Sequence, residues 1–305
     1  MEDYPKTLME FEKQFSDESA CRAYIMRMKW PQGFQCPRCG HQQAWPVRGV
    51  LFQCTACDHQ ASVIKGTLFQ GSHLPLTLWF RAMWWVTSQK NGTSALGLQR
   101  VLGLGSYKTA WAMLHKFRRA MVRTGRERLA GRIEVDETFV GGVEEGRRGR
   151  KIASKALVVI AAQEEGPGVG RIRMQRITDA SAHTLQAFVK ANIEPGSIVH
   201  SDGWEGYTGL HNYGYRHEVS KLNQAPGSAI KLLPRVHRVV SLLKRWLLGT
   251  HQGAVRKEQL DYYLDEFTFR FNRRTSRYRG KLFYRLMQQA VTTAPISFEQ
   301  IARKV

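Results

Sequence analysis

No segment of the chain is apolar for long enough to span a membrane. The longest apolar run, residues 156–162, is far shorter than the roughly 20 residues that cross a bilayer as a helix. The chain starts with Met1, Glu2 and Asp3, and this acidic start does not resemble a signal peptide. These absences exclude a membrane-spanning protein and predict an intracellular location.

Acidic residues are scarce relative to basic ones. The 305 residues include 25 Asp and Glu against 46 Lys and Arg, which gives a formal net charge of +21. A surface this basic predicts a polyanionic partner, and nucleic acid is the default one. No polybasic amphipathic segment supports anionic lipid as the partner instead. Hydrophobic residues make up 43% of the chain, so it has enough of them to bury a core.

Cysteine is absent from the whole chain after residue 57. Each C-x2-C pair suits a tight turn that points both sulfurs at one centre, and four thiolates complete a tetrahedral zinc site with no open position. We therefore predict structural Zn²⁺ in a ribbon, with residues 47–52 as a hairpin arm. Cys21 lies outside the spacing and fits a small buried side chain, and His59 is an alternative ligand that we expect at the surface. The four cysteines in the pattern are Cys36, Cys39, Cys54 and Cys57.

Three regions that differ in composition and hydrophobic spacing predict three consecutive domains. Residues 1–70 hold the cysteines and an N-terminal helix, and residues 71–130 have the apolar spacing of helices. From residue 131 to residue 305, short β-branched runs alternate with helical segments, which predicts a mixed α/β domain. The expected strands are 133–135, 155–162, 171–177, 197–200 and 215–219, and the expected helices are 181–192, 234–248 and 257–271.

The helical region contains a candidate DNA-binding motif. Two helical segments, 93–102 and 106–121, are separated by a glycine-rich turn, which fits a helix-turn-helix. In that arrangement Ser106, Tyr107 and Lys108 approach the bases of a major groove. An ordinary helical hairpin that only packs a core stays open as an alternative. The basic composition and the neighbouring zinc ribbon favour DNA binding.

Two aspartates stand at the ends of expected strands in the α/β region. Asp136 ends the first strand, and Asp202 follows the fourth. Strand alternation places Glu134 and Asp136 on one face and the apolar Ile133 and Val135 on the other. Hard oxygen ligands on neighbouring strands suit Mg²⁺, and two such ions activate water and stabilise the leaving oxygen in phosphodiester cleavage. Taken alone, either aspartate also fits a turn or a cap.

The helix 234–248 supplies a candidate third group. His237 and Lys244 are two turns apart, so they lie on one face of that helix, at the edge of its apolar stripe. His237 can ligate a metal or orient water, and Lys244 can hold a phosphate. These two residues alone leave open that they are simply a surface histidine and a surface lysine.

Several long motifs in the right order resemble one known family. The chain is similar, over nearly its whole length, to the zinc-ribbon-bearing insertion-sequence transposases of the DDE, ribonuclease H-like superfamily. The resemblance implies a ribonuclease H-like mixed-sheet catalytic domain that cleaves and joins double-stranded DNA at element ends and target. It also implies a homo-oligomer on DNA, in the bacterial cytoplasm at the nucleoid. The motifs are the cysteine pattern, Val-Asp-Glu-Thr-Phe-Val-Gly-Gly at 135–142, His-Ser-Asp-Gly-Trp at 200–204, and segments 236–251 and 263–274.

Carried over to this sequence, the resemblance makes Asp136 and Asp202 ligands of catalytic Mg²⁺. The third ligand in the superfamily is usually Glu, seven residues before a Lys, whereas the residue seven before Lys244 is His237. A neutral imidazole removes one negative charge and is a softer ligand, so we expect Mn²⁺ to substitute well for Mg²⁺. Acidic residues of a later helix are possible substitutes that we expect to face elsewhere: Asp261, Asp265 and Glu266.

The loop expected after the first strand is rich in glycine and basic residues. Phosphate contact and a solvated loop both fit it. Trp204 and Tyr207 follow the second aspartate and fit either stacking on a splayed base or core packing. Two further functions stay open: a catalytically inactive DNA-binding regulator, and a nuclease without strand transfer. The basic loop residues assigned to DNA are Arg147, Arg148, Arg150 and Lys151.

Overall fold

The chain forms two compact units in a computed structural model that describes residues 2–48, 50–123, 125–141, 155–220, 232–253 and 255–302. The first unit combines Met1–Arg123 with Thr275–Lys304, and the second is Thr124–Arg274. This division differs from the three consecutive regions expected from the sequence, because the C-terminal residues return to the first unit. Within the described ranges, no helix is both long and apolar enough to cross a bilayer.

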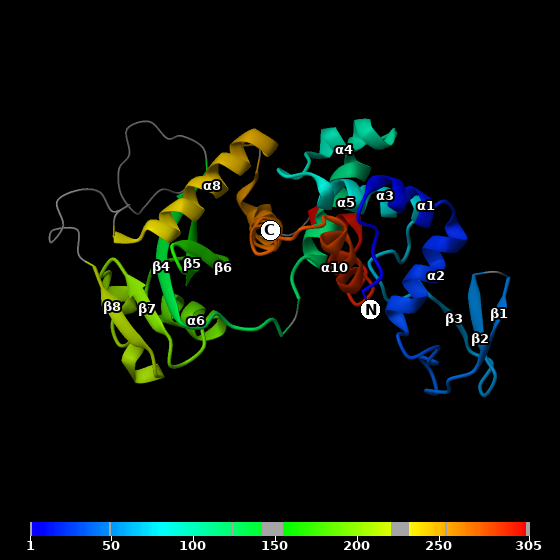
Figure 1. Ribbon diagram of the computed structural model, residues 1–305, viewed down its shortest axis with the longest axis horizontal. Coiled ribbons are helices and arrows are strands. Elements are labelled where there is room, and N and C mark those ends of the chain that lie inside the picture. The colour runs from blue at the N-terminus through cyan, green and yellow to red at the C-terminus, as the bar shows by residue number, and fades with distance from the viewer. Residues whose placement is uncertain are drawn as a thin grey trace. The chain divides into compact units, whose positions relative to one another are not determined.

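The first unit is an assembly of helices that carries a small antiparallel sheet. In Figure 1 helix α10, from the C-terminal part of the chain, lies among the helices of the N-terminal region, and it packs against α2, α3 and α5. The helices are α1 (Leu8–Gln14), α2 (Glu18–Lys29), α3 (Leu76–Ser88), α4 (Ala95–Leu102), α5 (Tyr107–Ala120), α10 (Gly280–Ala290) and α11 (Phe298–Ala302). The sheet has the order β1 (Ala44–Val47), β2 (Leu51–Cys54) and β3 (Gln60–Ser62).

Aromatic packing explains why α10 belongs to the first unit. The ring of Phe283 lies 5.5 Å from that of Phe11 and 5.8 Å from that of Phe80, centroid to centroid, and all three side chains are buried. Aromatic pairs at such separations contribute beyond the area they bury. A Cβ on Gly280, at the start of α10, would overlap the carbonyl of Pro5. The C-terminal helix therefore completes the core that the N-terminal helices begin.

Helices α4 and α5 match the expected helix-turn-helix. The Ser94 hydroxyl accepts a hydrogen bond from the Gly97 amide at 3.1 Å and so caps α4. Gly103 ends that helix with φ 63°, a left-handed conformation that glycine adopts without steric cost. The Ser106 hydroxyl then accepts from the Lys108 amide at 3.2 Å and caps α5. Each boundary is set by a local capping group, which is why the sequence predicts it well.

The second unit is built on a five-stranded mixed sheet, which confirms the expected mixed α/β class. Strands β4, β5 and β6 pair antiparallel, while β7 runs parallel to both β4 and β8. Strand β4 is longer than the expected 133–135. The order across the sheet is β6 (Gly168–Ile177), β5 (Ala156–Glu165), β4 (Arg132–Val140), β7 (Ile198–Ser201) and β8 (Arg216–Val219).

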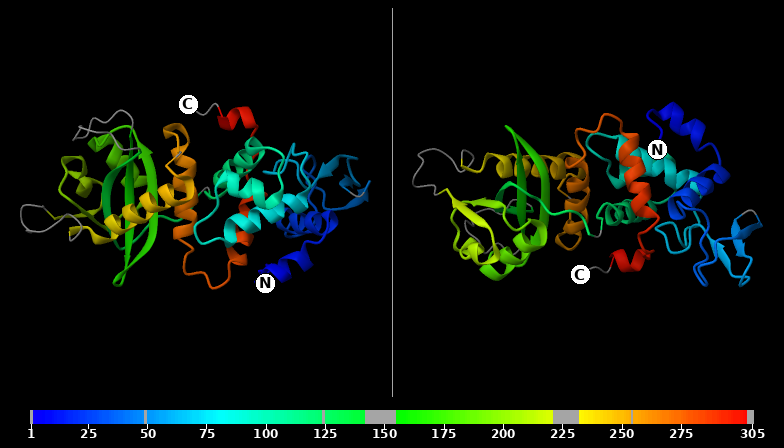
Figure 2. Two further views of the ribbon diagram at one scale, coloured as in Figure 1. Left: turned by 90° about the horizontal axis from the view of Figure 1, so that it is seen from above. Right: turned by 60° about the horizontal axis from the view of Figure 1, so that its bottom comes forward.

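Helices cover both faces of this sheet. Ile133 and Val135 pack with α6 in one buried cluster, while Ile160 of β5 packs with Val236 and Leu243 of α8 in the other. The gold helix α8 lies across the green strands (Figure 2), and it contacts β4 and β5. The alternation predicted for β4 is confirmed. The covering elements are α6 (Ala182–Asn192), η1 (Glu205–Tyr207) and η2 (Leu210–Tyr213) on one face, and α8 (Pro234–His251), η4 (Lys257–Gln259) and α9 (Leu260–Phe271) on or beside the other.

Candidate functional site

Strand register brings the two predicted aspartates together in the second unit. In the parallel pairing of β4 with β7, Glu134 lies across from His200. The same offset, continued by two residues, places Asp136 across from Asp202, which directly follows β7. The parallel pairing ends at Glu134 and His200, so both aspartates lie two residues beyond the last paired level.

Asp136 is not at the end of a short strand, as expected, but in the middle of the nine-residue β4. The strand continues because residues up to Val140 remain paired with β5, where Val140 lies across from Ala156. Asp136 is therefore held by ladder hydrogen bonds on both sides of its position along the strand. Its backbone has little freedom, which suits a residue that must hold a fixed position.

The turn after β7 orients Asp202. Its Oδ1 accepts a hydrogen bond from the Trp204 amide at 3.0 Å, and Gly203 between them has φ 86°, in the left-handed region that favours glycine. The Trp204 indole donates to the carbonyl of Ala180 at 2.8 Å. The glycine thus lets the chain fold back at Asp202, and Trp204 anchors the turn to the segment before α6.

Tyr207 is a buried tyrosine whose hydroxyl contacts an acidic residue of β4. It is fully buried, and its hydroxyl donates to Glu137 Oε1 at 2.6 Å. Burial first, and then the negative charges of Glu137, Asp136 and Asp202, raise the pKa of Tyr207 well above its ordinary value of 10.0. Its burial favours core packing over stacking on a splayed base.

Helix α8 brings His237 beside Asp136. His237 lies in the first turn, and its Nε2 is 3.9 Å from Asp136 Oδ2, with the two side chains 24% and 15% exposed. Both groups therefore remain accessible to a ligand from solvent. Lys244, two turns further along, is exposed. Loss of hydration, and then the positive charge of Lys155, lower the pKa of Lys244. A pair of neighbouring lysines suits a phosphate.

The donor set has the chemistry of a divalent-cation site. Asp136 and Asp202 offer hard carboxylate oxygens, and His237 offers an imidazole nitrogen. Among the residues that the structure describes, only the four cysteines bring three or more ligand atoms of His, Cys, Asp or Glu within 4.8 Å of one another. The three groups fit Mg²⁺ or Mn²⁺ by chemistry, and they must close further to share one ion.

The acidic residues of α9 are engaged with arginines away from this site. Asp261 pairs with Arg176 at 3.2 Å. Glu266 is buried and pairs with Arg270 at 2.8 Å. Asp265 lies on the same helix, between them in sequence. These contacts agree with the expectation that the acidic residues of this helix face elsewhere, and they leave His237 as the third group beside Asp136.

The four cysteines converge in the ribbon of the first unit. The Sγ atoms of Cys36 and Cys57 are 3.7 Å apart, and those of Cys39 and Cys54 are 3.6 Å apart. Zinc–sulfur bonds of about 2.3 Å place the sulfurs of a tetrahedral site about 3.8 Å from one another, so the cluster fits Zn²⁺. Cys21 lies apart from it, fully buried on α2, where burial raises the pKa of its thiol to about 12.

The two knuckles of the ribbon share one backbone geometry. The Gly40 amide donates to the Cys36 carbonyl at 2.9 Å, and the Asp58 amide donates to the Cys54 carbonyl at 3.1 Å. Gly40 has φ 76° and Asp58 has φ 54°, so both occupy the left-handed position of the turn. His59, the alternative ligand, is not part of the cluster. Each cysteine pair is therefore presented by a tight turn, as its spacing predicts.

The residues expected to meet DNA bases lie at the start of α5. Tyr107 is 51% exposed, and Lys108 is also exposed. Ser106 is partly occupied because its hydroxyl caps the helix through the Lys108 amide. Tyr107 and Lys108 are thus the two members of this set whose side chains are accessible.

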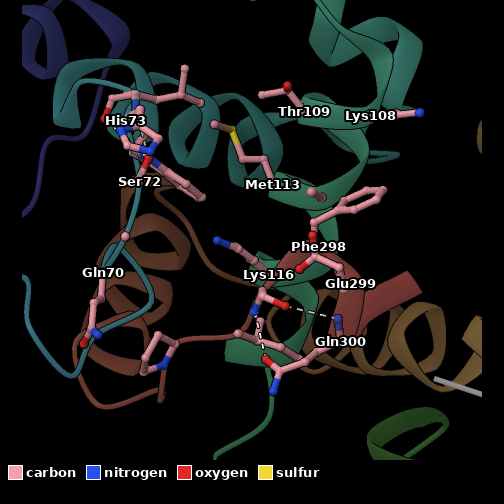
Figure 3. A pocket seen from close by; sticks show the side chains of 17 residues that line it. Gln70, Ser72, His73, Lys108, Thr109, Met113, Lys116, Phe298, Glu299 and Gln300 are labelled. Atoms are coloured by element: carbon pink, nitrogen blue, oxygen red, sulfur yellow. Dashed lines mark hydrogen bonds between the residues drawn. The ribbon is translucent and has the colours of Figure 1, made fainter. Parts of the chain in front are cut away.

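A cavity of about 790 Å³ follows one side of α5 (Figure 3). Lys108, Thr109 and Lys116 of α5 line it, opposite segments 70–74 and 295–300. Lys116 lies over the ring of Trp79, 5.8 Å from the centroid, and burial lowers its pKa. The C-terminal segment therefore helps to form the surface beside the helix that the sequence assigns to DNA.

The basic loop assigned to phosphates lies outside the described residues. This applies to Arg147, Arg148, Arg150 and Lys151, which follow the last described residue of that segment, Gly141. Their assignment stays a prediction from the sequence.

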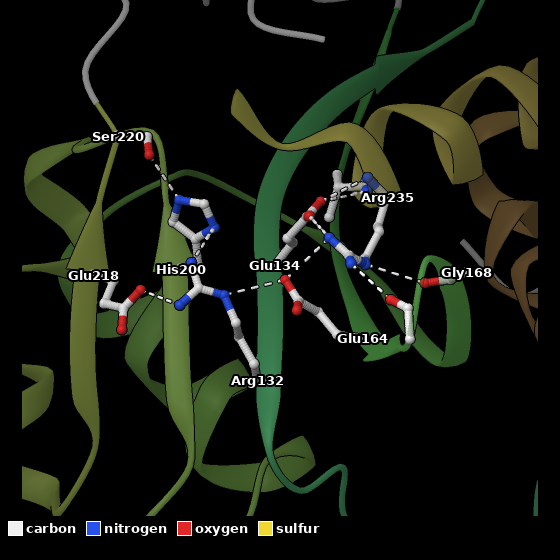
Figure 4. A network of polar contacts seen from close by, with 10 residues as sticks. Arg132, Glu134, Glu164, Gly168, His200, Glu218, Ser220 and Arg235 are labelled. Atoms are coloured by element: carbon white, nitrogen blue, oxygen red, sulfur yellow. Dashed lines mark hydrogen bonds and ion pairs between the residues drawn. The ribbon is translucent and has the colours of Figure 1, made fainter. Parts of the chain in front are cut away.

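Sequence reasoning missed a polar network on the α8 side of β4 (Figure 4). Glu134, 1% exposed, accepts hydrogen bonds from the amides of Arg235 at 2.7 Å and Val236 at 2.9 Å, and it pairs with the Arg235 guanidinium at 3.0 Å. Glu164 also pairs with Arg235, at 3.1 Å. The available signal was an acidic residue inside an apolar strand, two positions before Asp136 and on the same face.

Comparisons with known proteins match two separate stretches of the chain. Residues 128–272 match the model of the ISXO2-like transposase domain, and residues 16–60 match that of the transposase zinc-ribbon domain. A protein described as an uncharacterized protein in transposable element ISH50 of Halobacterium salinarum is 26% identical over 280 residues, covering 85% of this chain and 92% of that protein.

Two solved structures of the Mos1 transposase are also similar to the chain. The strand transfer complex has a TM-score of 0.29 and 12% identity, covering 74% of this chain and 77% of that one. The paired-end complex with the left transposon end has a TM-score of 0.23 and 12% identity, covering 64% and 76%. The matched family domain coincides with the five-stranded sheet and its helices, and the expected ribonuclease H-like fold class is confirmed.

Proposed function

The chain belongs to the zinc-ribbon-bearing insertion-sequence transposases, and we propose that it binds the terminal inverted repeats of its element and catalyses metal-dependent cleavage and transfer of DNA strands. The observation that supports the catalytic part is the 3.9 Å approach of His237 Nε2 on α8 to Asp136 Oδ2 on β4. Asp202 directly follows β7, the parallel neighbour of β4, at the same offset from Asp136 as in the paired residues.

In the proposed reaction, Asp136, Asp202 and His237 hold Mg²⁺ or Mn²⁺. Bound divalent ions supply activation of the attacking oxygen and charge stabilisation at the leaving oxygen. The chain itself fixes the backbone of Asp136 through the pairing of β4 with β5. Lys244 and Lys155 hold a phosphate beside the reacting one, which fixes the position of the strand. Hydrolysis and attack by a 3′-hydroxyl are both in-line displacements at phosphorus, so one arrangement of residues serves both.

Recognition of DNA is assigned to the first unit and to the basic loop. The zinc ribbon, with Zn²⁺ held by its four thiolates, and α5 read the element ends, with Tyr107 and Lys108 nearest the bases. The loop residues and Lys244 contact phosphates. Joining two element ends requires two copies of the chain, so we propose a homo-oligomer on DNA. The phosphate-contacting loop residues are Arg147, Arg148, Arg150 and Lys151.

The proposal is tested by cleavage of labelled DNA that carries the element's own ends, with Mg²⁺ and then with Mn²⁺. We expect nicking at the ends by the wild type and joined products when target DNA is added. Asp136→Asn should bind the same DNA without nicking it. Tight binding without cleavage under either metal would instead identify a DNA-binding regulator. Cleavage with no joined product would identify a nuclease.

A further inference from the structure

The N-cap residue of helix α8 cannot cap it with a side chain. Its N-cap residue, Leu233, makes no side-chain hydrogen bond to the helix. The first backbone amides of a helix have no partner within it, and leaving such donors buried and unpaired is costly. Here the amides of Arg235 and Val236 both donate to Oε2 of Glu134, at 2.7 Å and 2.9 Å. A residue of the central strand therefore caps the helix that carries His237.

The capping contact is charged and enclosed. Glu134 is 1% exposed, and its other oxygen, Oε1, accepts from the Arg235 guanidinium at 3.0 Å. Arg235 also donates to the carbonyls of Gly168 at 3.1 Å and Gly166 at 3.0 Å, in the β5–β6 turn. A carboxylate at a helix N-terminus is favoured by the helix dipole as well as by these hydrogen bonds. The first turn of α8 is thus fixed to β4 and to the adjoining hairpin.

This contact has a direct consequence for the candidate site. Glu134 is two residues from Asp136 on the same face of β4, and Val236, which it binds, is the residue before His237. We infer that Glu134 is a positioning residue: by capping α8 it sets the imidazole of His237 beside the carboxylate of Asp136. The inference rests on the proposed function, because it assigns Glu134 to the geometry of that site.

The chain offers a matched control for this role. Glu164 pairs with the same arginine, at 3.1 Å, and with Arg132 at 3.1 Å, but the α8 amides at the helix start donate to Glu134 and not to Glu164. Glu164→Gln therefore removes one charge from the network and leaves the cap in place. Glu134→Gln keeps the size of the side chain, but it removes the charge and turns one carboxylate oxygen into an amide that cannot accept.

The first experiment measures the Mn²⁺ concentration that gives half-maximal cleavage of element-end DNA. Loss of a residue that orients a metal ligand typically weakens metal affinity about 10- to 100-fold. We expect Glu134→Gln to raise the required concentration by that factor, with a smaller effect on the rate at saturating metal. Glu164→Gln should stay close to the wild type. An equal rise in both variants overturns the inference, because the effect then belongs to the arginine network.

A second measurement needs neither activity nor a variant that folds. Hydrogen exchange of the wild-type chain with its zinc, without DNA and without added Mg²⁺ or Mn²⁺, reports whether the amides of Arg235 and Val236 are protected. We expect protection similar to that of the amides in the middle of α8. Exchange as fast as in an exposed peptide overturns the inference. If these amides are protected and the wild type cleaves no DNA with either metal, the cap stands and the proposed catalysis fails, so the two failures are distinguishable.

Discussion

The zinc ribbon and the carboxylate site both gather ligands, but they do so over very different lengths of chain. The ribbon's thiolates come from two turns joined by a short hairpin, and its buried cluster is small: Phe34, Cys36, Cys54 and Ala61. Asp136, Asp202 and His237 come from β4, the turn after β7 and α8, which two large buried clusters hold in place. We therefore expect the ribbon to need its metal to fold, whereas the elements that carry Asp136, Asp202 and His237 should fold without a metal, which then draws these three groups closer together.

The largest expected effect is loss of the ribbon when one thiolate is removed. Structural zinc in small domains contributes about 10–16 kcal/mol to folding, and Cys54→Ser takes away a ligand that is fully buried. We expect the purified variant to lose its zinc, measured by metal analysis, and its binding to element-end DNA.

Cys21→Ala is the control, because Cys21 is equally buried but outside the cluster. It should keep a full complement of zinc. Retention of zinc and DNA binding by Cys54→Ser would contradict the claim that the ribbon needs its metal to fold.

The second prediction concerns the carboxylate site. Asp136→Asn should lower cleavage by about 10³-fold or more, because several kcal/mol of charge stabilisation is lost at about 1.4 kcal/mol per factor of ten. The melting temperature should stay near that of the wild type, as should that of wild-type protein stripped of Mg²⁺. Asp261→Asn, which alters an acidic residue of α9 paired with Arg176, serves as the control and should cleave normally. Unfolding of the second unit on removal of Mg²⁺ would show that the protein does not pre-assemble this site.

A third prediction tests which unit the C-terminal helix belongs to. Phe283→Ala removes a buried ring that contacts Phe11 and Phe80, and such truncations cost about 3–5 kcal/mol. Hydrogen exchange should accelerate in α1 and α3 and remain unchanged in β4 and β5. Phe298→Ala, which removes a ring that is 39% exposed, should change much less. Faster exchange in the strands of the second unit instead would show that α10 stabilises that unit.

The smallest expected effect is at Tyr207. Tyr207→Phe removes a hydrogen bond to the charged Glu137, worth about 1.5–3 kcal/mol. The folded pKa of Tyr207 is raised above its ordinary value of 10.0, so its contribution is full below pH 10 and is lost as the pH rises above that value. Denaturant unfolding should show the wild type losing stability above pH 10 more steeply than the variant. If the free energy of unfolding falls equally with pH in both proteins, the pKa of Tyr207 is not raised by folding.

What the sequence predicts well is what neighbouring residues determine. The cysteine spacing, the serine caps of α4 and α5, and the alternation of Ile133 and Val135 with Glu134 all depend on local geometry. The length of β4 was underestimated, because its second half is held by pairing with β5 and not by its own composition.

Other features depend on contacts between distant segments. The cap from Glu134 to α8 joins residues about one hundred positions apart, and no spacing rule in the sequence signals it. The same applies to the return of α10 to the first unit, which is decided by the ring of Phe283 and the close approach at Gly280. The sequence identified His237 by its spacing of seven residues from Lys244. Its place beside Asp136, however, follows from the packing of α8 on the sheet.

The return of α10 to the first unit has a consequence for how the protein is made. A ribosome releases the N-terminal helices first, but the aromatic surface around Phe11 and Phe80 stays uncovered until residues near 283 emerge. A gene copy whose reading frame is truncated anywhere before α10 therefore yields a polypeptide with an incomplete core and exposed aromatic side chains. Because such a product exposes apolar surface, we expect proteases and chaperones to remove it before it competes with intact copies.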